Sequence, residues 1–163
     1  VASLDILDNV VPFIGGEEGK IETETLKLLG SVEEGRFVFA DIKVSASCNR
    51  VHVKDGHLES VSIELKKKVS RDELIPVLRE FNPLRELNLP FAPPQPIVVR
   101  DEDNRPQPRY DRDAGSGMAC VVGRIRPCPV LDYKLTVLSH NTVRGAAVAA
   151  ILNAEYLKVK GLL

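Results

Sequence analysis

The stretch that decides the fold runs from Lys54 to Lys66 and reads KDGHLESVSIELK. Three apolar residues in it alternate with polar ones, as in a strand with one buried face: Val61, Ile63 and Leu65. Residues 54–56 have the composition of a tight turn, and a segment with valine at both ends, residues 51–53 (VHV), precedes them. The pattern therefore predicts a β-hairpin, with His57 beside its tip.

Two helices are predicted before this hairpin. Ser3 begins a short capped helix that extends to Val11 and stops at Pro12. Glu17 to Leu29 has acidic residues in its first turn and apolar residues near one face, and Gly30 stands where a left-handed C-cap is expected.

The sequence after the hairpin predicts one more helix, a connector and further strands. Ser70 and Glu73 form a capping box for a helix that ends near Phe81 and contains Pro76. The elements expected after it are a proline-rich connector at 90–96, strands at 97–100, 118–126 and 131–139, a charged loop at 101–117, and a helix at 142–160 capped by Asn141.

This order of elements predicts an α+β fold. Its sheet is mixed but largely antiparallel, and helices cover one face. A chain of 163 residues should bury roughly 70% of the surface it exposes when unfolded, which is enough for one compact domain.

Composition excludes several classes of partner. The 22 Lys and Arg nearly balance the 23 Asp and Glu, and only 5% of residues are aromatic, so no nucleic-acid partner is expected. The longest apolar stretch, residues 145–152, is far shorter than the roughly 20 residues that cross a bilayer, so no membrane partner is expected either. Three cysteines without a CxxC pair predict a reducing, cytoplasmic setting and no metal site.

The residues that could carry chemistry are few, because glycine-rich nucleotide loops and the common hydrolase motifs are missing from the sequence. His57 and Arg50 could project from one end of the hairpin as an acid/base beside an anion clamp. Glu17 and Lys20 share a helix face and could receive an ammonium and an anion. On spacing alone, all four also fit solvated surface groups, and Cys48 fits a small packing residue.

Four separated motifs resemble one enzyme family. They are residues 3–9 (SLDILDN), 45–61 (SASCNRVHVKDGHLESV), 104–115 (NRPQPR and DRDAG around Tyr110) and 139–147 (SHNTVRGAA). In order and spacing they resemble aspartate-semialdehyde dehydrogenases, especially the archaeal and fungal branch. The resemblance implies a fold like the C-terminal domain of glyceraldehyde-3-phosphate dehydrogenases.

The resemblance also implies an activity: NADPH-dependent reduction of L-aspartyl 4-phosphate to L-aspartate 4-semialdehyde with release of phosphate, on the route to lysine, threonine and methionine. In that family a cysteine thiolate attacks the acyl phosphate. His57 falls at the acid/base position and Arg50, with Asn49, at the position that binds the substrate carboxylate. Glu17 matches the carboxylate that receives the substrate amino group, Lys20 the phosphate-binding ammonium, and Asn141 a residue near the nicotinamide of NADP.

By the same resemblance, the nucleophilic cysteine and the cofactor-binding glycines are expected upstream of Val1. Residues 1–140 would be the catalytic and dimerisation domain of a homodimer or homotetramer, and residues 141–163 a helix that packs on an N-terminal cofactor domain. Two alternatives stay open. One is a malonyl-CoA or succinyl-CoA reductase on the same fold, from which Glu17 and the pair Asn49-Arg50 would distinguish this chain. The other is a non-catalytic dimerisation module.

Overall fold

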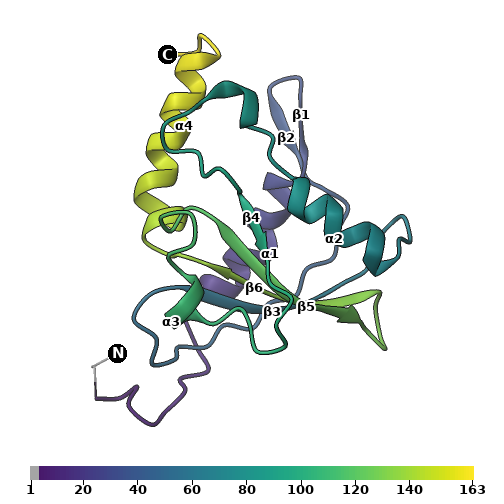
Figure 1. Ribbon diagram of the computed structural model, residues 1–163, viewed down its shortest axis with the longest axis vertical. Helices are drawn as coiled ribbons and strands as arrows, with labels where there is room; N and C mark the ends of the chain where they lie inside the picture. The colour runs from purple at the N-terminus through teal and green to yellow at the C-terminus, as the bar shows by residue number, and fades with distance from the viewer. Residues whose placement is uncertain (1–3) are drawn as a thin grey trace. The chain divides into compact units, whose positions relative to one another are not determined.

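A computed structural model describes residues 4–163 (Figure 1). Contacts divide the chain into two compact units, of which the first ends at Val53 and the second comprises Lys54–Leu163. The sequence predicts one compact domain, and the division into two units at residue 53 differs from that prediction.

The first unit is built around helix α1 (Glu17–Leu28), as the sequence predicts. The expected left-handed conformation at Gly30 is wrong, because this glycine, which follows the C-cap residue Leu29, does not have a positive φ. Glycine serves another purpose there. A Cβ on Gly30 would lie 2.1 Å from the carbonyl oxygen of Val38, so only glycine lets the following hairpin approach the end of the helix.

That hairpin consists of β1 (Ser31–Glu33) and β2 (Arg36–Val38), and the sequence analysis missed it. Its two turn residues, Glu34 and Gly35, both have positive φ, 48° and 75°. Two left-handed residues in a two-residue loop match the twist of the flanking strands. The signal that could have revealed the hairpin is therefore the Glu-Gly pair between two short apolar segments.

Two other predictions for the first unit are wrong. Residues 4–8 form turns instead of a helix, and the predicted cap Ser3 lies outside the described residues. The segment at 51–53, predicted as the first strand of the hairpin, belongs to no sheet. The extended residues 44–53 form one isolated β-bridge, between Arg50 and Val11.

The second unit contains a four-stranded sheet in the order β3 (His57–Ile63), β6 (Tyr133–Ser139), β5 (Cys120–Pro127), β4 (Ile97–Val99). The β3–β6 and β6–β5 pairs are antiparallel and the β4–β5 pair is parallel. The predicted α+β class and the largely antiparallel sheet are thus confirmed. The predicted hairpin is wrong: β3 pairs with β6, seven residues in register, and the segment before the turn remains in the first unit.

Helix α2 (Arg71–Glu80) covers one face of this sheet beside β4 (Figure 1). Ile75 is buried from it against Val122, Ile125 and Tyr133. The predicted capping box is confirmed, since the Ser70 hydroxyl accepts from the Glu73 amide at 3.2 Å and the Glu73 carboxylate accepts from the Ser70 amide at 2.7 Å. The predicted interior proline, Pro76, lies within α2.

The charged loop at 101–117 contains the short helix α3 (Pro108–Asp111) and is organised by the carboxylate of Asp111, which is fully buried. Arg100 donates to it at 3.0 Å, Arg105 donates to both of its oxygens, and the Gln107 amide donates at 2.7 Å. Burial opposes ionisation, but the hydrogen bonds and charges of these donors outweigh it and lower the pKa of Asp111.

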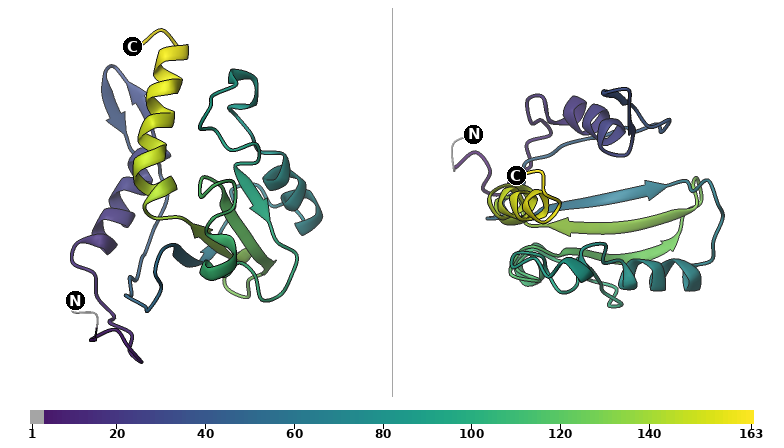
Figure 2. Two further views of the ribbon diagram at one scale, coloured as in Figure 1. Left: turned by 60° about the vertical axis from the view of Figure 1, so that its left-hand side comes forward. Right: turned by 90° about the horizontal axis from the view of Figure 1, so that it is seen from above.

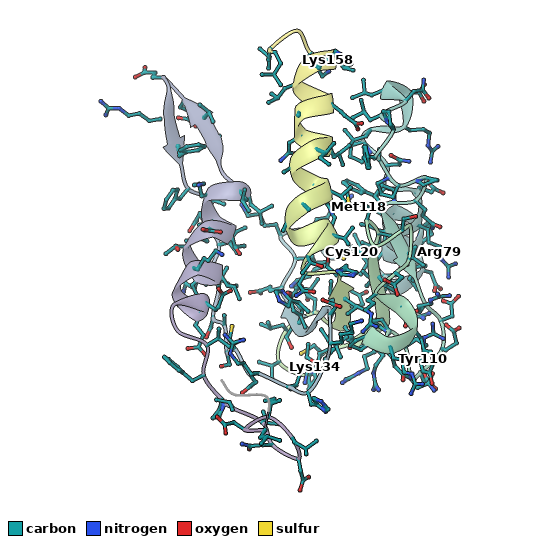
Figure 3. All side chains as sticks on the ribbon, turned by 90° about the vertical axis from the view of Figure 1, so that its left-hand side faces the viewer. Arg79, Tyr110, Met118, Cys120, Lys134 and Lys158 are labelled. Carbon is teal, nitrogen blue, oxygen red and sulfur yellow. The ribbon has the colours of Figure 1, made fainter. Side chains whose placement is uncertain are left out.

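The last helical segment begins as a π-helical turn, Val143–Ala147, and continues as α4 (Val148–Val159). The base of α4 packs through Leu152 on Met118 and Leu89, the latter in the connector that follows the 3₁₀ helix Arg85–Leu87 (Figure 3). The rest of α4 extends away from the sheet (Figure 2). It exposes apolar side chains there, among them Leu157 and Val159.

Candidate functional site

The first group of candidate residues lies on α1. Gly16 precedes the helix in a left-handed conformation with φ 78°, and Glu17 and Lys20 follow in its first turn and a half. Residues three apart in a helix lie on the same side, so the two side chains form an acidic and a basic group next to each other. Glu17 is half-buried and Lys20 is exposed.

Two further carboxylates on α1 hold the extended segment that carries Asn49 and Arg50. Glu18 accepts a hydrogen bond from the Cys48 amide at 2.8 Å, and Glu22 accepts one from the Ala46 amide at 2.9 Å. Because Glu18 and Glu22 are one helical turn apart, they bind alternate amides of the segment, which therefore runs along the helix.

The backbone of Arg50 is fixed on its other side by Val11, with N–O distances of 2.9 and 3.1 Å. Its guanidinium is exposed, as is the side chain of Asn49. Within residues 4–53, Glu17, Lys20, Asn49 and Arg50 make no side-chain hydrogen bond or ion pair. The first unit thus presents a carboxylate, an ammonium, an amide and a guanidinium that are available to a ligand.

The second group lies at the start of β3. His57 is the first residue of that strand, stands opposite Ser139 on β6, and is exposed. Gly56 precedes it with φ 109°, a value that L side chains rarely adopt. The imidazole therefore projects from the end of a strand whose position the sheet determines.

Asn141 follows β6 and does not cap the last helix as the sequence predicts. Its Oδ1 accepts a hydrogen bond from the Gly56 amide at 2.9 Å instead. The prediction fails because the antiparallel register that pairs His57 with Ser139 brings the residues just beyond this pair together. The side chain of Asn141 is thereby committed to the turn before His57.

The structure brings the predicted residues together in two sets. Glu17, Lys20, Asn49 and Arg50 lie in the first unit, whereas His57 and Asn141 lie in the second. The expectation that Arg50 and His57 project from one sheet is wrong, since Arg50 lies outside the sheet that contains His57.

Glu18 and Glu22 were not predicted from the sequence, although their four-residue spacing beside two candidate residues was an available signal. The role of Asp111 was not predicted either. No local pattern shows that a carboxylate in a polar loop will be buried among arginines, because the loop that surrounds it is held against β5 by contacts distant in sequence. A Cβ on Gly123 of β5 would lie 2.3 Å from the Arg105 carbonyl oxygen.

The cysteines of the second unit differ in their environments. Burial raises the pKa of the Cys120 thiol, and the charge of Glu59 adds to the effect. A hydrogen bond from the Leu131 amide, at 3.3 Å, lowers the pKa of Cys128 in the turn between β5 and β6.

In residues 4–163 no three His, Cys, Asp or Glu side chains are arranged to hold a metal ion. Nor is any helix within that range long and apolar enough to span a bilayer.

Comparison with known proteins reveals strong similarity to one family of enzymes. The chain is 55% identical over 157 residues to the aspartate-semialdehyde dehydrogenase of Archaeoglobus fulgidus, covering 96% of this chain and 45% of that protein. It is 47% identical over 171 residues to that of Candida albicans, covering 100% of this chain and 47% of the other. The chain thus spans about half the length of the curated relatives it matches.

Solved structures give the same result. The crystal structure of aspartate semialdehyde dehydrogenase with NADP from Candida albicans matches with a TM-score of 0.91 at 47% identity, over 100% of this chain and 48% of that one. Aspartate semialdehyde dehydrogenase II from Vibrio cholerae matches with a TM-score of 0.72 at 26% identity, over 92% and 41%.

A domain family described as "Semialdehyde dehydrogenase, dimerisation domain" matches residues 1–144. This range contains every candidate residue of both units. The chain therefore belongs to the semialdehyde dehydrogenase family and carries its dimerisation domain.

Proposed function

We propose that the chain is the substrate-binding part of an aspartate-semialdehyde dehydrogenase, which converts L-aspartyl 4-phosphate to L-aspartate 4-semialdehyde and phosphate with NADPH. The observation that carries this proposal is the similarity along nearly the whole chain to enzymes of that name in archaea and fungi. The site geometry supports it, because each set presents exposed polar groups, Lys20, Asn49 and Arg50 in the first unit and His57 in the second, on backbone that hydrogen bonds hold in place.

The charges of the first unit suit an amino-acid phosphate. The Arg50 guanidinium can bind a carboxylate through two parallel hydrogen bonds, and the Asn49 amide beside it can add a further donor. The Glu17 carboxylate can accept from an α-ammonium group, and Lys20 offers a point charge for phosphate. A malonyl-CoA or succinyl-CoA reductase would not need Glu17, since its substrate has no α-amino group.

The chemical role proposed for this chain belongs to His57. An imidazole can take the proton of an attacking thiol and later return one to an oxygen of the tetrahedral intermediate. Its place at the start of β3 fixes the backbone from which the ring projects. A positioned general acid or base of this kind contributes roughly 10²–10⁴-fold to a rate.

NADPH would supply the hydride. Asn141 is the residue proposed to lie near its nicotinamide. Its Oδ1 already accepts from the Gly56 amide, and its Nδ2 is the group that can donate to an acceptor of the cofactor. We propose that the nucleophilic cysteine and most of the cofactor site belong to an N-terminal domain of the whole protein. Residues 1–140 would then form the catalytic and dimerisation domain, and residues 141–163 would pack on the cofactor domain through the apolar side chains of α4.

The family description includes dimerisation, and we propose that a second copy binds the sheet face opposite α2. That face holds an open groove of about 450 Å³. Leu58, Ser60, Lys134 and Thr136 are among the residues that line it. The side chain of Leu58 is 49% exposed, which leaves apolar surface for a partner to cover. Leu58→Asp should reduce the mass of the assembled protein in light scattering, and an unchanged mass would exclude this face.

The activity is tested with the full-length protein. It is supplied with L-aspartate 4-semialdehyde, phosphate and NADP⁺, and the formation of reduced nicotinamide is followed. A parallel reaction contains malonyl-CoA and NADPH. Activity that requires both the semialdehyde and phosphate is the expected result. Turnover of the CoA thioester alone would favour the reductase, and inactivity in both reactions would favour a non-catalytic dimerisation module.

A further inference from the structure

The turn before His57 is held from two sides within the second unit. On one side, the Gly56 amide donates to Asn141 Oδ1 at 2.9 Å. On the other, Arg112 Nη1 lies 3.5 Å from the carbonyl oxygen of Asp55. Gly56, the residue before His57, is therefore fixed by Asn141 from the end of β6. Asp55, the residue before Gly56, lies beside Arg112 from the end of α3.

Packing at Gly56 leaves this turn little room to move. A Cβ at that position would lie 3.2 Å from Leu138 Cδ1 and 3.6 Å from Arg112 Cβ. Leu138 is fully buried in β6, so the turn rests on a part of the core that cannot shift easily. The hydrogen bond that the Gly56 amide donates to Asn141 then fixes the direction of this amide, and with it the direction in which the chain enters β3.

The chemistry of the contact is unambiguous. A backbone N–H can only donate, so the atom of Asn141 that faces it must be the amide oxygen. In the antiparallel register, His57 stands opposite Ser139, and Asn141 lies two residues beyond that pair. Its side chain thus supplies an acceptor beyond the last pair of the β3–β6 ladder.

We infer that Asn141 is a positioning residue for His57. By holding the Gly56 amide, it sets where β3 begins and so the place from which the imidazole reaches the reacting atoms. This inference rests on the proposed function, because it assigns no role to Asn141 without an acid/base at His57. A displacement of about 1 Å in such a group can cost about 10²-fold in rate.

The test uses the full-length enzyme with two readouts. Asn141→Leu keeps the approximate size of the side chain and removes the acceptor, Asn141→Asp restores an acceptor, and Asn141→Ala replaces the leucine variant if that variant does not fold. Asn82→Ala is the matched control, since Asn82 also makes one hydrogen bond to the backbone, to the Pro94 carbonyl at 3.0 Å. Turnover and KM are measured together with hydrogen exchange of the Gly56 amide.

The expected result for Asn141→Leu is exchange of the Gly56 amide at least about tenfold faster and turnover roughly 10- to 100-fold lower, with KM for the semialdehyde within about threefold. Asn141→Asp should recover most of both losses, and Asn82→Ala should match the wild type. Unchanged Gly56 exchange in Asn141→Leu would overturn the inference. So would an effect confined to KM for NADP⁺, which would reduce Asn141 to a cofactor contact.

Failure of the inference is distinguishable from failure of the proposed function by His57→Gln. If His57→Gln is nearly inactive and Asn141→Leu keeps full turnover, the inference alone fails. If His57→Gln turns over as fast as the wild type, the acid/base role fails and the inference fails with it, even if exchange of the Gly56 amide shows that the hydrogen bond exists.

Discussion

The carboxylate of Glu18 accepts a hydrogen bond from the backbone amide of Cys48 at 2.8 Å, although thirty residues separate them in sequence. Glu22, one turn further along α1, repeats the contact with Ala46. Together the two carboxylates hold the segment that ends in Asn49 and Arg50. The helix that carries two proposed ligands of the substrate thus also positions the other two.

Removing the first of these contacts should weaken substrate binding. Glu18→Ala is expected to raise KM for L-aspartate 4-semialdehyde about three- to tenfold in the full-length enzyme. A hydrogen bond to a charged group contributes on the order of 1.5–3 kcal/mol, and relaxation of the segment should recover part of this free energy. Turnover should change by less than about threefold. Steady-state kinetics measure both quantities.

Glu24→Ala is the control for that experiment. Glu24 lies on the same helix and is exposed, so its removal changes the net charge equally without releasing the segment. The same KM in the Glu18 and Glu24 variants would contradict the positioning role of Glu18.

Asp111 should make the second unit sensitive to acid. Its pKa is lowered in the folded state, so the carboxylate stabilises the fold fully above its ordinary value of 3.8. This stabilisation is lost as the pH falls through the lower folded-state pKa. Urea unfolding between about pH 6 and pH 3 should therefore show a larger free energy of unfolding for the wild type than for Asp111→Asn, and this difference should shrink at the acidic end.

The matched control is Asp113→Asn, because the Asp113 side chain is 77% exposed and its ion-pair contacts are both at 3.8 Å. It should lose little stability at any pH in that range. A wild-type advantage over Asp111→Asn that is constant with pH would show that the Asp111 carboxylate does not titrate differently in the folded and unfolded states.

Gly123→Ala should destabilise the second unit strongly. The new Cβ would lie 2.3 Å from the Arg105 carbonyl oxygen, so the charged loop must move off β5. A loss of about 3 kcal/mol or more is expected, since such a steric conflict with backbone has no rotamer that relieves it. Thermal unfolding measures the loss.

Gly145→Ala offers the comparison, because its Cβ would meet the His140 carbonyl oxygen at an ordinary 3.6 Å. A small change or a slight gain in melting temperature is expected there. Equal melting temperatures for the two variants would mean that the loop does not press on Gly123.

The elements that the sequence predicts well are those whose signals are local. Ser70 and Glu73 define the start of α2 within four residues, and the alternation of Val61, Ile63 and Leu65 marks the strand that becomes β3. The partner of β3 was not predictable in this way. A turn at 54–56 suggests a hairpin, and only the packing of the whole sheet selects β6 instead.

The candidate site divides along the same line. The spacing of Glu17, Lys20, Arg50 and His57 makes them candidates but also fits ordinary surface residues, so the family resemblance alone assigns their roles. What the sequence did not reveal are the contacts that hold them, Glu18 with Cys48 and Asn141 with Gly56, because each joins residues that are far apart in the chain. At the start of a predicted helix, Asn141 is interpreted as a cap, and only the register of β6 shows that it binds the Gly56 amide instead.

The most direct test of the central claim is the turnover of the full-length enzyme with His57→Gln, measured with L-aspartate 4-semialdehyde, phosphate and NADP⁺. His52→Gln is the control, as His52 is exposed and lies in the segment before the turn. A loss of roughly 10²–10⁴-fold is expected for His57→Gln, and wild-type turnover is expected for His52→Gln. Wild-type turnover in both variants would contradict the acid/base role of His57 and leave the domain with a role in assembly alone.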